Sequence, residues 1–110
     1  MPTPKPTPEQ LEQFVAQYKR TKVVDLDVEG LDQTFVLRPP SVAEYKMHKD
    51  TAKRGEAAKA LERLVTVCIV FPERKEVEEI AKDFPGVFDS LSDPVARLAG
   101  LGEAVEKKTA

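Results

Sequence analysis

Three kinds of side chain in this sequence could take part in chemistry: a histidine, a cysteine and a run of carboxylates. His48 is the only histidine, and helical spacing places Glu44 four residues before it. A general base needs a carboxylate that orients it or a nucleophile beside it. Glu44 is already explained as a helix-capping residue, so we interpret His48 as a surface or partly buried bystander.

The cysteine is a weaker candidate for chemistry than the histidine. Cys68 is the only cysteine, and it lies in the most apolar stretch of the chain. A buried free cysteine behaves as a small apolar side chain, and its thiol is inert. One thiol forms no intramolecular disulfide and no thiolate zinc site within one chain. We therefore place Cys68 in the core of a protein suited to a reducing cytoplasm.

Carboxylates are concentrated in a predicted helix over residues 73–83, where Glu76, Glu79 and Asp83 share one face. Lysines alternate with them, which is typical of a solvated face. A small metal-dependent enzyme using this face stays an alternative, but other ligands would have to converge there. The phosphate-binding and nucleophile-elbow glycine motifs are absent from the sequence. We therefore predict a protein that is not an enzyme, with no catalytic residue, no cofactor and no metal.

Composition excludes several classes of partner. The 110 residues carry a net charge of -2, no tryptophan and 6% aromatic residues, so neither a basic patch nor a stacking platform for nucleic acid is expected. No apolar run approaches the about 20 residues that span a membrane. The N-terminus lacks the apolar region of a signal peptide, which predicts a cytoplasmic protein.

Prolines, a capping box and a glycine-bearing turn in the first half of the chain predict a helix followed by a β-hairpin. Prolines alternate with polar residues over 1–8, which predicts a disordered arm, and a Thr7–Gln10 capping box opens a helix over 8–20. Residues 22–28 and 33–39 follow the alternation of strands, with a Gly-bearing turn at 29–32 between them. Arg38, on the outward face of the second strand, is expected to pair with Asp25 or Asp27 across the hairpin.

The second half is predicted to be helical. A double proline ends the hairpin, and a Ser41–Glu44 capping box opens a helix over 42–53. Further helices are predicted over 56–70 and 73–84, and the last segment, 87–99, is one kinked helix or two short ones. The fold class is therefore α+β and mostly helical: a short N-terminal helix, one β-hairpin, then a bundle of three to four helices. One domain covers 9–102, and 103–110 form a flexible end.

Two oppositely charged helical faces suggest self-association. Lys46, Lys49 and Lys53 share one face of the predicted helix 42–53, whereas Glu76, Glu79 and Asp83 share the acidic face of 73–83. Opposite faces on a nearly neutral protein suit head-to-tail association into a homo-oligomer. The alternative is that both faces are simply solvated.

The order of these structural signals resembles the tail assembly chaperones of long-tailed bacteriophages and related phage-like elements. The resemblance covers residues 9–102 and lies in the spacing of short motifs rather than in chemical groups. These motifs are Arg38-Pro39, Ser41 with Glu44-Tyr45, Cys68-Ile69-Val70 before Phe71-Pro72, Phe84-Pro85-Gly86, and Leu98-Ala99-Gly100. The arm at 1–8 is not part of the pattern.

The resemblance implies a non-enzymatic chaperone that coats the tape-measure protein, keeps it soluble during virion assembly, and departs when tail-tube protein polymerises around it. Apolar residues of three predicted helices are candidate contacts for that partner, unless they belong to the core: Phe14, Tyr18, Val65, Ile69, Val77 and Ile80. The alternative function is a permanent structural subunit of a phage or phage-like particle, such as a tail-completion or connector protein.

Overall fold

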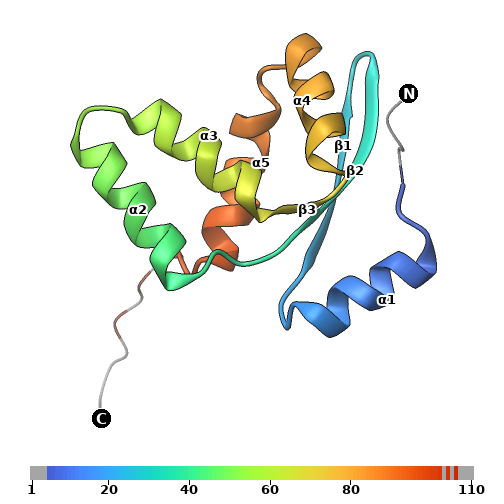
Figure 1. Cartoon of the computed structure of the whole chain (residues 1–110), viewed down its shortest axis with the longest axis horizontal. Coiled ribbons are helices and arrows are strands. Elements are labelled where there is room, and N and C mark those ends of the chain that lie inside the picture. Colours follow the sequence, from blue (N-terminus) through green and yellow to red (C-terminus); the bar gives the residue numbers. More distant parts are fainter. Residues whose placement is uncertain (1–4, 103, 105, 107–110) are drawn as a thin grey trace.

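A computed structural model describes residues 5–102, 104 and 106. Within this part of the chain it contains five helices and three strands in an α+β arrangement that is mostly helical (Figure 1). The elements in chain order are α1 (Pro8–Gln17), β1 (Lys22–Val28), β2 (Leu31–Leu37), α2 (Val42–Lys53), α3 (Ala57–Cys68), β3 (Ile69–Phe71), α4 (Arg74–Asp83) and α5 (Val87–Leu98). The predicted fold class is confirmed, and the sheet has one strand more than expected.

Both predicted capping boxes are present. The Thr7 hydroxyl accepts from the backbone of Gln10, and the Gln10 side chain accepts from the backbone of Thr7. Ser41 and Glu44 exchange the same two bonds at the start of α2. Each box satisfies backbone N–H groups that the first turn of a helix leaves unpaired. The predicted helix 8–20 is confirmed at its start, because Pro8 is the first residue of α1, but it ends at Gln17. Residues 1–4 of the predicted arm lie outside the described part.

The hairpin is regular from end to end. β1 and β2 pair antiparallel from Lys22 opposite Leu37 to Val28 opposite Leu31, so Glu29 and Gly30 form the turn. Alternation then places Val24 and Leu26 on the face that meets the core. The turn is tighter than the predicted 29–32, because Leu31 and Asp32 already belong to β2.

Gly30 is the residue that permits this turn, with a φ of 86°. A Cβ at this position would also lie 3.4 Å from the ring of Phe84. We expect Gly30→Ala to lower the free energy of unfolding by about 1–2 kcal/mol, because L side chains resist this backbone region. Urea unfolding measures the change. Gly86→Ala is the matched control, since Gly86 has a φ of -71° and open space around it. Equal losses in the two variants would contradict this account.

The predicted helix 56–70 is wrong at its end. α3 stops at Cys68, and Ile69–Phe71 pair antiparallel with β2 through a register shift between Val36 and Leu37. β-branched residues such as Ile69 and Val70 favour a strand when a free strand edge lies within reach. The last segment is one helix, with Pro94 inside it.

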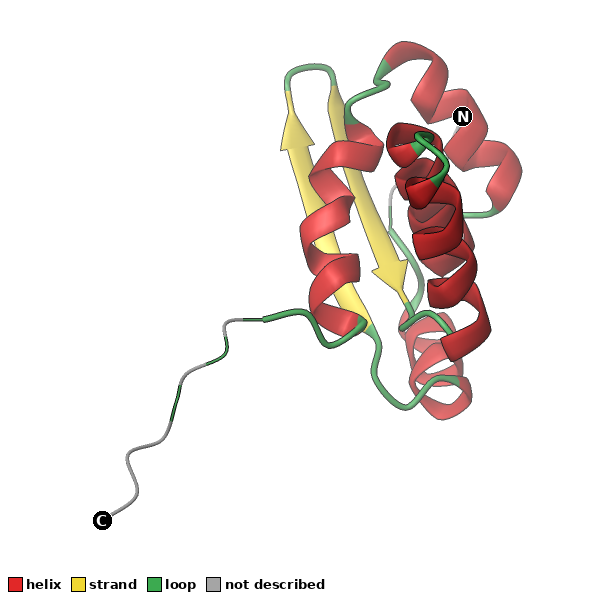
Figure 2. Ribbon diagram, turned by 90° about the vertical axis from the view of Figure 1, so that its left-hand side faces the viewer, coloured by secondary structure: helices red, strands yellow, loops and turns green. Residues whose placement is uncertain are grey.

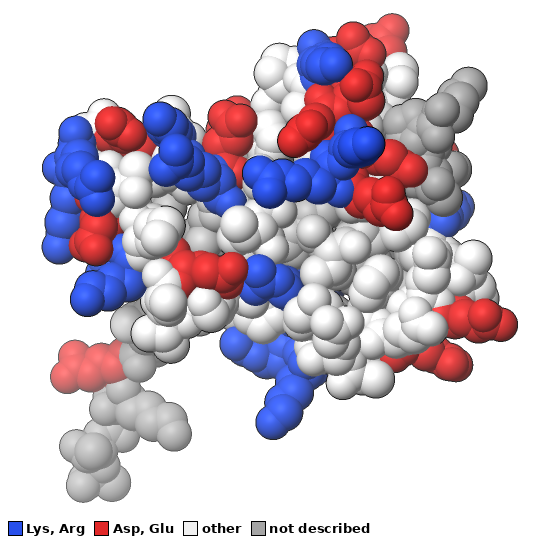
Figure 3. Space-filling view, in the orientation of Figure 1, with Lys and Arg blue, Asp and Glu red and all other residues white. Residues whose placement is uncertain are grey.

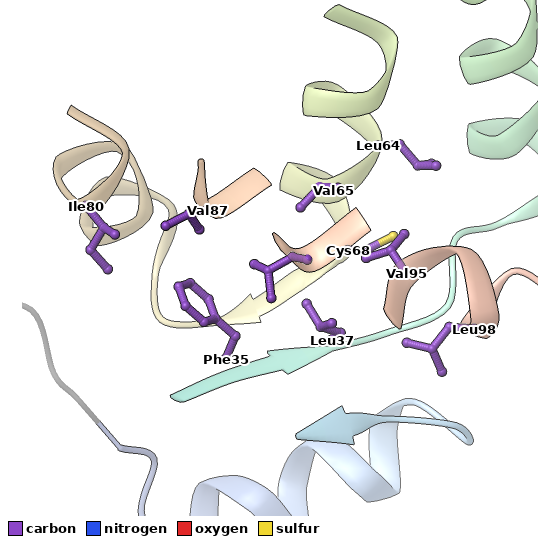
Figure 4. Close-up of a cluster of buried hydrophobic side chains, with 10 residues drawn as sticks. Phe35, Leu37, Leu64, Val65, Cys68, Ile80, Val87, Val95 and Leu98 are labelled. Atoms are coloured by element: carbon purple, nitrogen blue, oxygen red, sulfur yellow. The ribbon is translucent and has the colours of Figure 1, made fainter. Parts of the chain in front are cut away.

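The core lies between the sheet and the helices α3, α4 and α5 (Figure 4). Phe35 and Leu37 of the central strand β2 are fully buried beneath Val65 and Cys68 of α3. The other members come from α3, α4 and α5: Leu64, Ile80, Val87, Leu91, Val95 and Leu98. This cluster uses the apolar stripes of three helices at once, so most of their apolar surface is occupied.

α1 and α2 lie at opposite ends of the molecule (Figure 1). α1 has no fully buried residue, and α2 packs against α3 as a helical hairpin. In the side view of Figure 2, β1 is the leftmost strand of the sheet. All helices except α5 lie to the right of β2 in this view. None of the helices in the described residues is long and apolar enough to cross a membrane.

Candidate partner-binding surface

A groove runs across one side of the helical layer and begins between α2 and α3. Thr51 of α2 and Ala60 of α3 are buried against each other's helices, and such small side chains let the two backbones approach closely. Met47 and Leu64 line the hollow of about 70 Å³ beside this contact. Its lining is apolar apart from the heads of a few polar side chains, so it suits an apolar anchor.

The groove widens between α3, α4 and the start of α5. A hollow of about 650 Å³ there has Val67, Val77, Ala81 and Phe88 among its lining residues. Charged side chains stand around it: Glu62, Arg63, Arg74, Glu78 and Lys82. Met47 and Val67 line both hollows and so join them into one surface, which we call the helical groove.

Met47 and Val67 are the apolar side chains that this groove presents most openly. Met47 is 65% exposed and Val67 is 41% exposed, although both are large and apolar. A thioether side chain is flexible and adapts to irregular partner surfaces. The sequence contained a signal for Met47, since it interrupts the polar face of 42–53. Val67 could not be separated from its buried neighbours by spacing alone.

The six contact residues expected from the resemblance fall into two groups. Val65, Val77 and Ile80 are buried, at 0%, 2% and 4% exposure, so they offer almost no surface to a partner. We assign Val65 and Ile80 to the core, and Val77, which lines the wide hollow, to the floor of the helical groove. Phe14, Tyr18 and Ile69 are half-buried and lie on α1, the turn after it, and β3. The structure therefore does not bring the six together on one face.

The two charged faces lie on separate helices, and Figure 3 shows basic side chains around α2 at the left and carboxylates gathered around α4 at the top. On α2, Lys46, Lys49 and Lys53 are all exposed. On α4, Glu79 and Asp83 are exposed and Glu76 is half-buried. The α4 face is partly neutralised, because Lys82 Nζ lies 2.9 Å from Glu79 Oε1. The exposed members of each face, Lys46, Lys49 and Lys53 on α2 and Glu79 and Asp83 on α4, can be reached by a second copy.

Arg38 pairs with Glu44, not with an aspartate of β1, so that expectation is wrong. Its guanidinium donates to both carboxylate oxygens of Glu44, at 2.9 and 2.8 Å, and lies 5.9 Å from the ring centre of Tyr18. The register explains the difference, because Asp25 lies opposite Thr34, whose hydroxyl donates to it. The pair joins the end of β2 to the first turn of α2, and its role is architectural.

The bonds from Arg38 hold the pKa of Glu44 at about 2, below its usual 4.5. A carboxyl whose pKa is lowered by folding stabilises the protein above the unfolded pKa, and that contribution is lost as pH falls from about 4.5 to about 2. We expect Glu44→Gln, which keeps the capping box, to lower the free energy of unfolding by about 1–2 kcal/mol near neutral pH. Urea unfolding at several pH values should show this difference shrinking in acid.

Glu78→Gln is the control for that measurement. Glu78 lies 3.7 Å from Arg74 in a pair whose side chains are both largely exposed, and such pairs contribute little. A difference between wild type and Glu44→Gln that stays constant down to about pH 3 would contradict the assigned role of the ion pair.

The histidine and the cysteine lie in different surroundings. Cys68 is fully buried, and burial raises the pKa of its thiol to about 11, so it stays protonated. His48 is half-buried beside Tyr45, with ring centres 5.9 Å apart. Its Nδ1 is buried without a hydrogen-bond partner among the described residues. Within those residues no group of three histidine, cysteine or acidic side chains is placed to hold a metal ion.

Comparisons with known proteins identify a family and a fold. The family described as Domain of unknown function (DUF6848) matches residues 5–108. A solved structure of an uncharacterised protein, RBSTP2171 from Bacillus stearothermophilus, is similar at a TM-score of 0.71 and 20% identity. The match covers 89% of this chain and 99% of that one, and at this identity it supports the fold alone. The search of curated proteins found no match.

Proposed function

Since this chain belongs to the DUF6848 family, whose description leaves function open, we propose from its own surface that it is a non-enzymatic phage tail assembly chaperone. In this proposal it binds the tape-measure protein in the cytoplasm of the host cell and keeps that protein soluble. The helical groove carries the proposal, with its exposed Met47 and Val67 above an apolar floor and charged side chains around it. The choice of the tape-measure protein as the partner comes from the resemblance of residues 9–102 to such chaperones.

The groove suits an amphipathic helix. A helix laid in a groove presents apolar anchors at i, i+3, i+4 and i+7, and a narrow and a wide hollow side by side accommodate successive anchors. Charges of both signs around the wide hollow match the polar flanks of such a helix. A tape-measure protein is long and helical, so it offers many such segments.

Several copies would bind along one tape-measure chain. The basic face of α2 and the acidic face of α4 are separate on the surface, which suits a head-to-tail contact between neighbouring copies. Weak sites in a row gain strength from multivalency. Tail-tube protein that polymerises around the same segments would displace the copies by competition, so the mechanism uses no nucleotide.

Co-expression tests this function. The tape-measure protein from the same genome is expressed with and without this chain, and its soluble fraction is compared after centrifugation. We expect soluble tape-measure protein in a complex with this chain, and aggregated protein in its absence. Tape-measure protein that is equally soluble alone would rule out the chaperone function.

The separate charged faces are also compatible with a second function, that of a permanent structural subunit of the particle. Head-to-tail contacts would then persist in the assembled tail. Mass spectrometry of purified particles separates the two functions, because a chaperone is absent from the finished particle and a structural subunit is present in stoichiometric amount.

A further inference from the structure

The outer edge of β1 is an exposed surface separate from the helical groove. β1 is a strand of 7 residues at the edge of the sheet, paired with β2 along its whole length. Among the described residues no strand pairs with its other edge. Val23 is 53% exposed and Val28 is 43% exposed. Neither proline nor a bulge interrupts β1, although natural proteins commonly use these devices to protect an edge.

The two faces of β1 differ in chemistry. Val24 and Leu26 pack partly against the core, so an added strand could continue that apolar layer. Asp25 and Asp27 are exposed on the opposite face. Asp27 also lies directly opposite Asp32 of β2, and like charges in such a pair repel each other. A cation brought beside Asp27 would relieve this repulsion.

We propose that β1 binds an extended segment of another protein by strand addition, and that this segment alternates apolar and basic side chains. Its apolar side chains would lie beside Val24 and Leu26, and its basic ones beside Asp25 and Asp27. Main-chain hydrogen bonds supply affinity in this mode, and alternate side chains supply selectivity. This site is separate from the helical groove and goes beyond the proposed chaperone function.

Charge also argues against a second copy as the occupant. When two β1 strands overlap fully with their apolar faces on the same side, Asp25 faces Asp25 of the second copy, and Val23 faces Asp27. Like charges directly opposite each other destabilise a strand pair. The same aspartates therefore disfavour self-pairing and favour a basic strand, which is how specificity commonly arises at interfaces.

The probe for this proposal is a synthetic labelled peptide of alternating lysine and valine, about as long as β1, whose binding is followed by fluorescence anisotropy. We expect Asp27→Lys to weaken binding about tenfold, which corresponds to about 1.4 kcal/mol. The variant should stay folded, because it removes the repulsion with Asp32. Asp50→Lys, an equal charge change on the exposed side of α2, should leave affinity within about twofold.

N-methylated peptides separate strand addition from general charge attraction. One peptide is methylated at the amides of its odd residues and another at those of its even residues, with sequence and charge unchanged. In an added strand, only the amides of alternate residues point toward β1 and form hydrogen bonds with it. We therefore expect the peptide methylated at the other amides to bind, and the peptide methylated at these amides not to bind. Equal binding of both peptides, or unchanged affinity in Asp27→Lys, would overturn the proposal, as would a β1-paired dimer of the free protein. Met47→Glu should not affect this peptide, which keeps the result independent of the groove.

Discussion

The variant carrying both Met47→Glu and Val67→Glu is expected to stay folded and to leave the tape-measure protein in the insoluble fraction. Both side chains are exposed, so the core loses little when they change. Glutamate is also a good helix former, which keeps α2 and α3 intact. A carboxylate pressed against an apolar anchor without a partner costs several kcal/mol, so we expect affinity to fall by about a hundredfold or more.

Val42→Glu is the matched control for this double variant. Val42 is 89% exposed, lies at the start of α2 and does not line the groove. A glutamate in the first turn is also favourable for the helix dipole. The measurement is the soluble fraction of tape-measure protein in co-expression, with thermal unfolding as the check on folding. If the control and the double variant solubilise the partner equally well, the helical groove is not the binding surface.

Local signals in the sequence were enough to predict most elements of this fold. Thr7 and Ser41 fix helix starts through hydrogen bonds to residues only three positions away, and both boxes formed. The alternation of residues 22–28 fixed the inward face of β1 in the same way. These features depend on short-range geometry, which sequence patterns record directly.

The features that escaped prediction depend on distant partners. Ile69 leaves the helix because β2 offers it an edge, and nothing within a helical turn of Ile69 reveals that edge. The sequence suggests an aspartate of β1 as the partner of Arg38, but the register of the hairpin places Asp25 beside Thr34. Glu44 then completes a bidentate pair that also forms part of a capping box.

The candidate site was harder to predict than the fold, because an apolar stripe does not reveal which of its residues is covered. Val65 and Val67 lie two residues apart in α3, yet Val65 is 0% exposed and Val67 is 41% exposed. Only the packing of α5 and the sheet against α3 makes the distinction. The sequence therefore predicted a helix over 56–70, whereas the structure identified Val67 as the side chain of its apolar stripe that faces outward.

Ile80→Ala is expected to have the largest effect on stability among these variants, with a loss of about 2–5 kcal/mol in the free energy of unfolding. Ile80 is 4% exposed and packs in the same cluster as Phe35 and Val87 (Figure 4). Truncation leaves a cavity that the sheet and α5 cannot fill. Since a domain of this size has only about 5–15 kcal/mol of stability, the loss is large.

The comparison of Ile80→Ala with Val67→Ala distinguishes a core residue from a contact residue. Urea unfolding and tape-measure binding are measured for both variants at a temperature where both are folded. We expect Ile80→Ala to lose stability and keep binding, and Val67→Ala to keep stability and lose binding, because only Val67 reaches the surface. The opposite pattern would return Ile80 to the set of contact residues, and would mean that α4 moves away from the core when the partner binds.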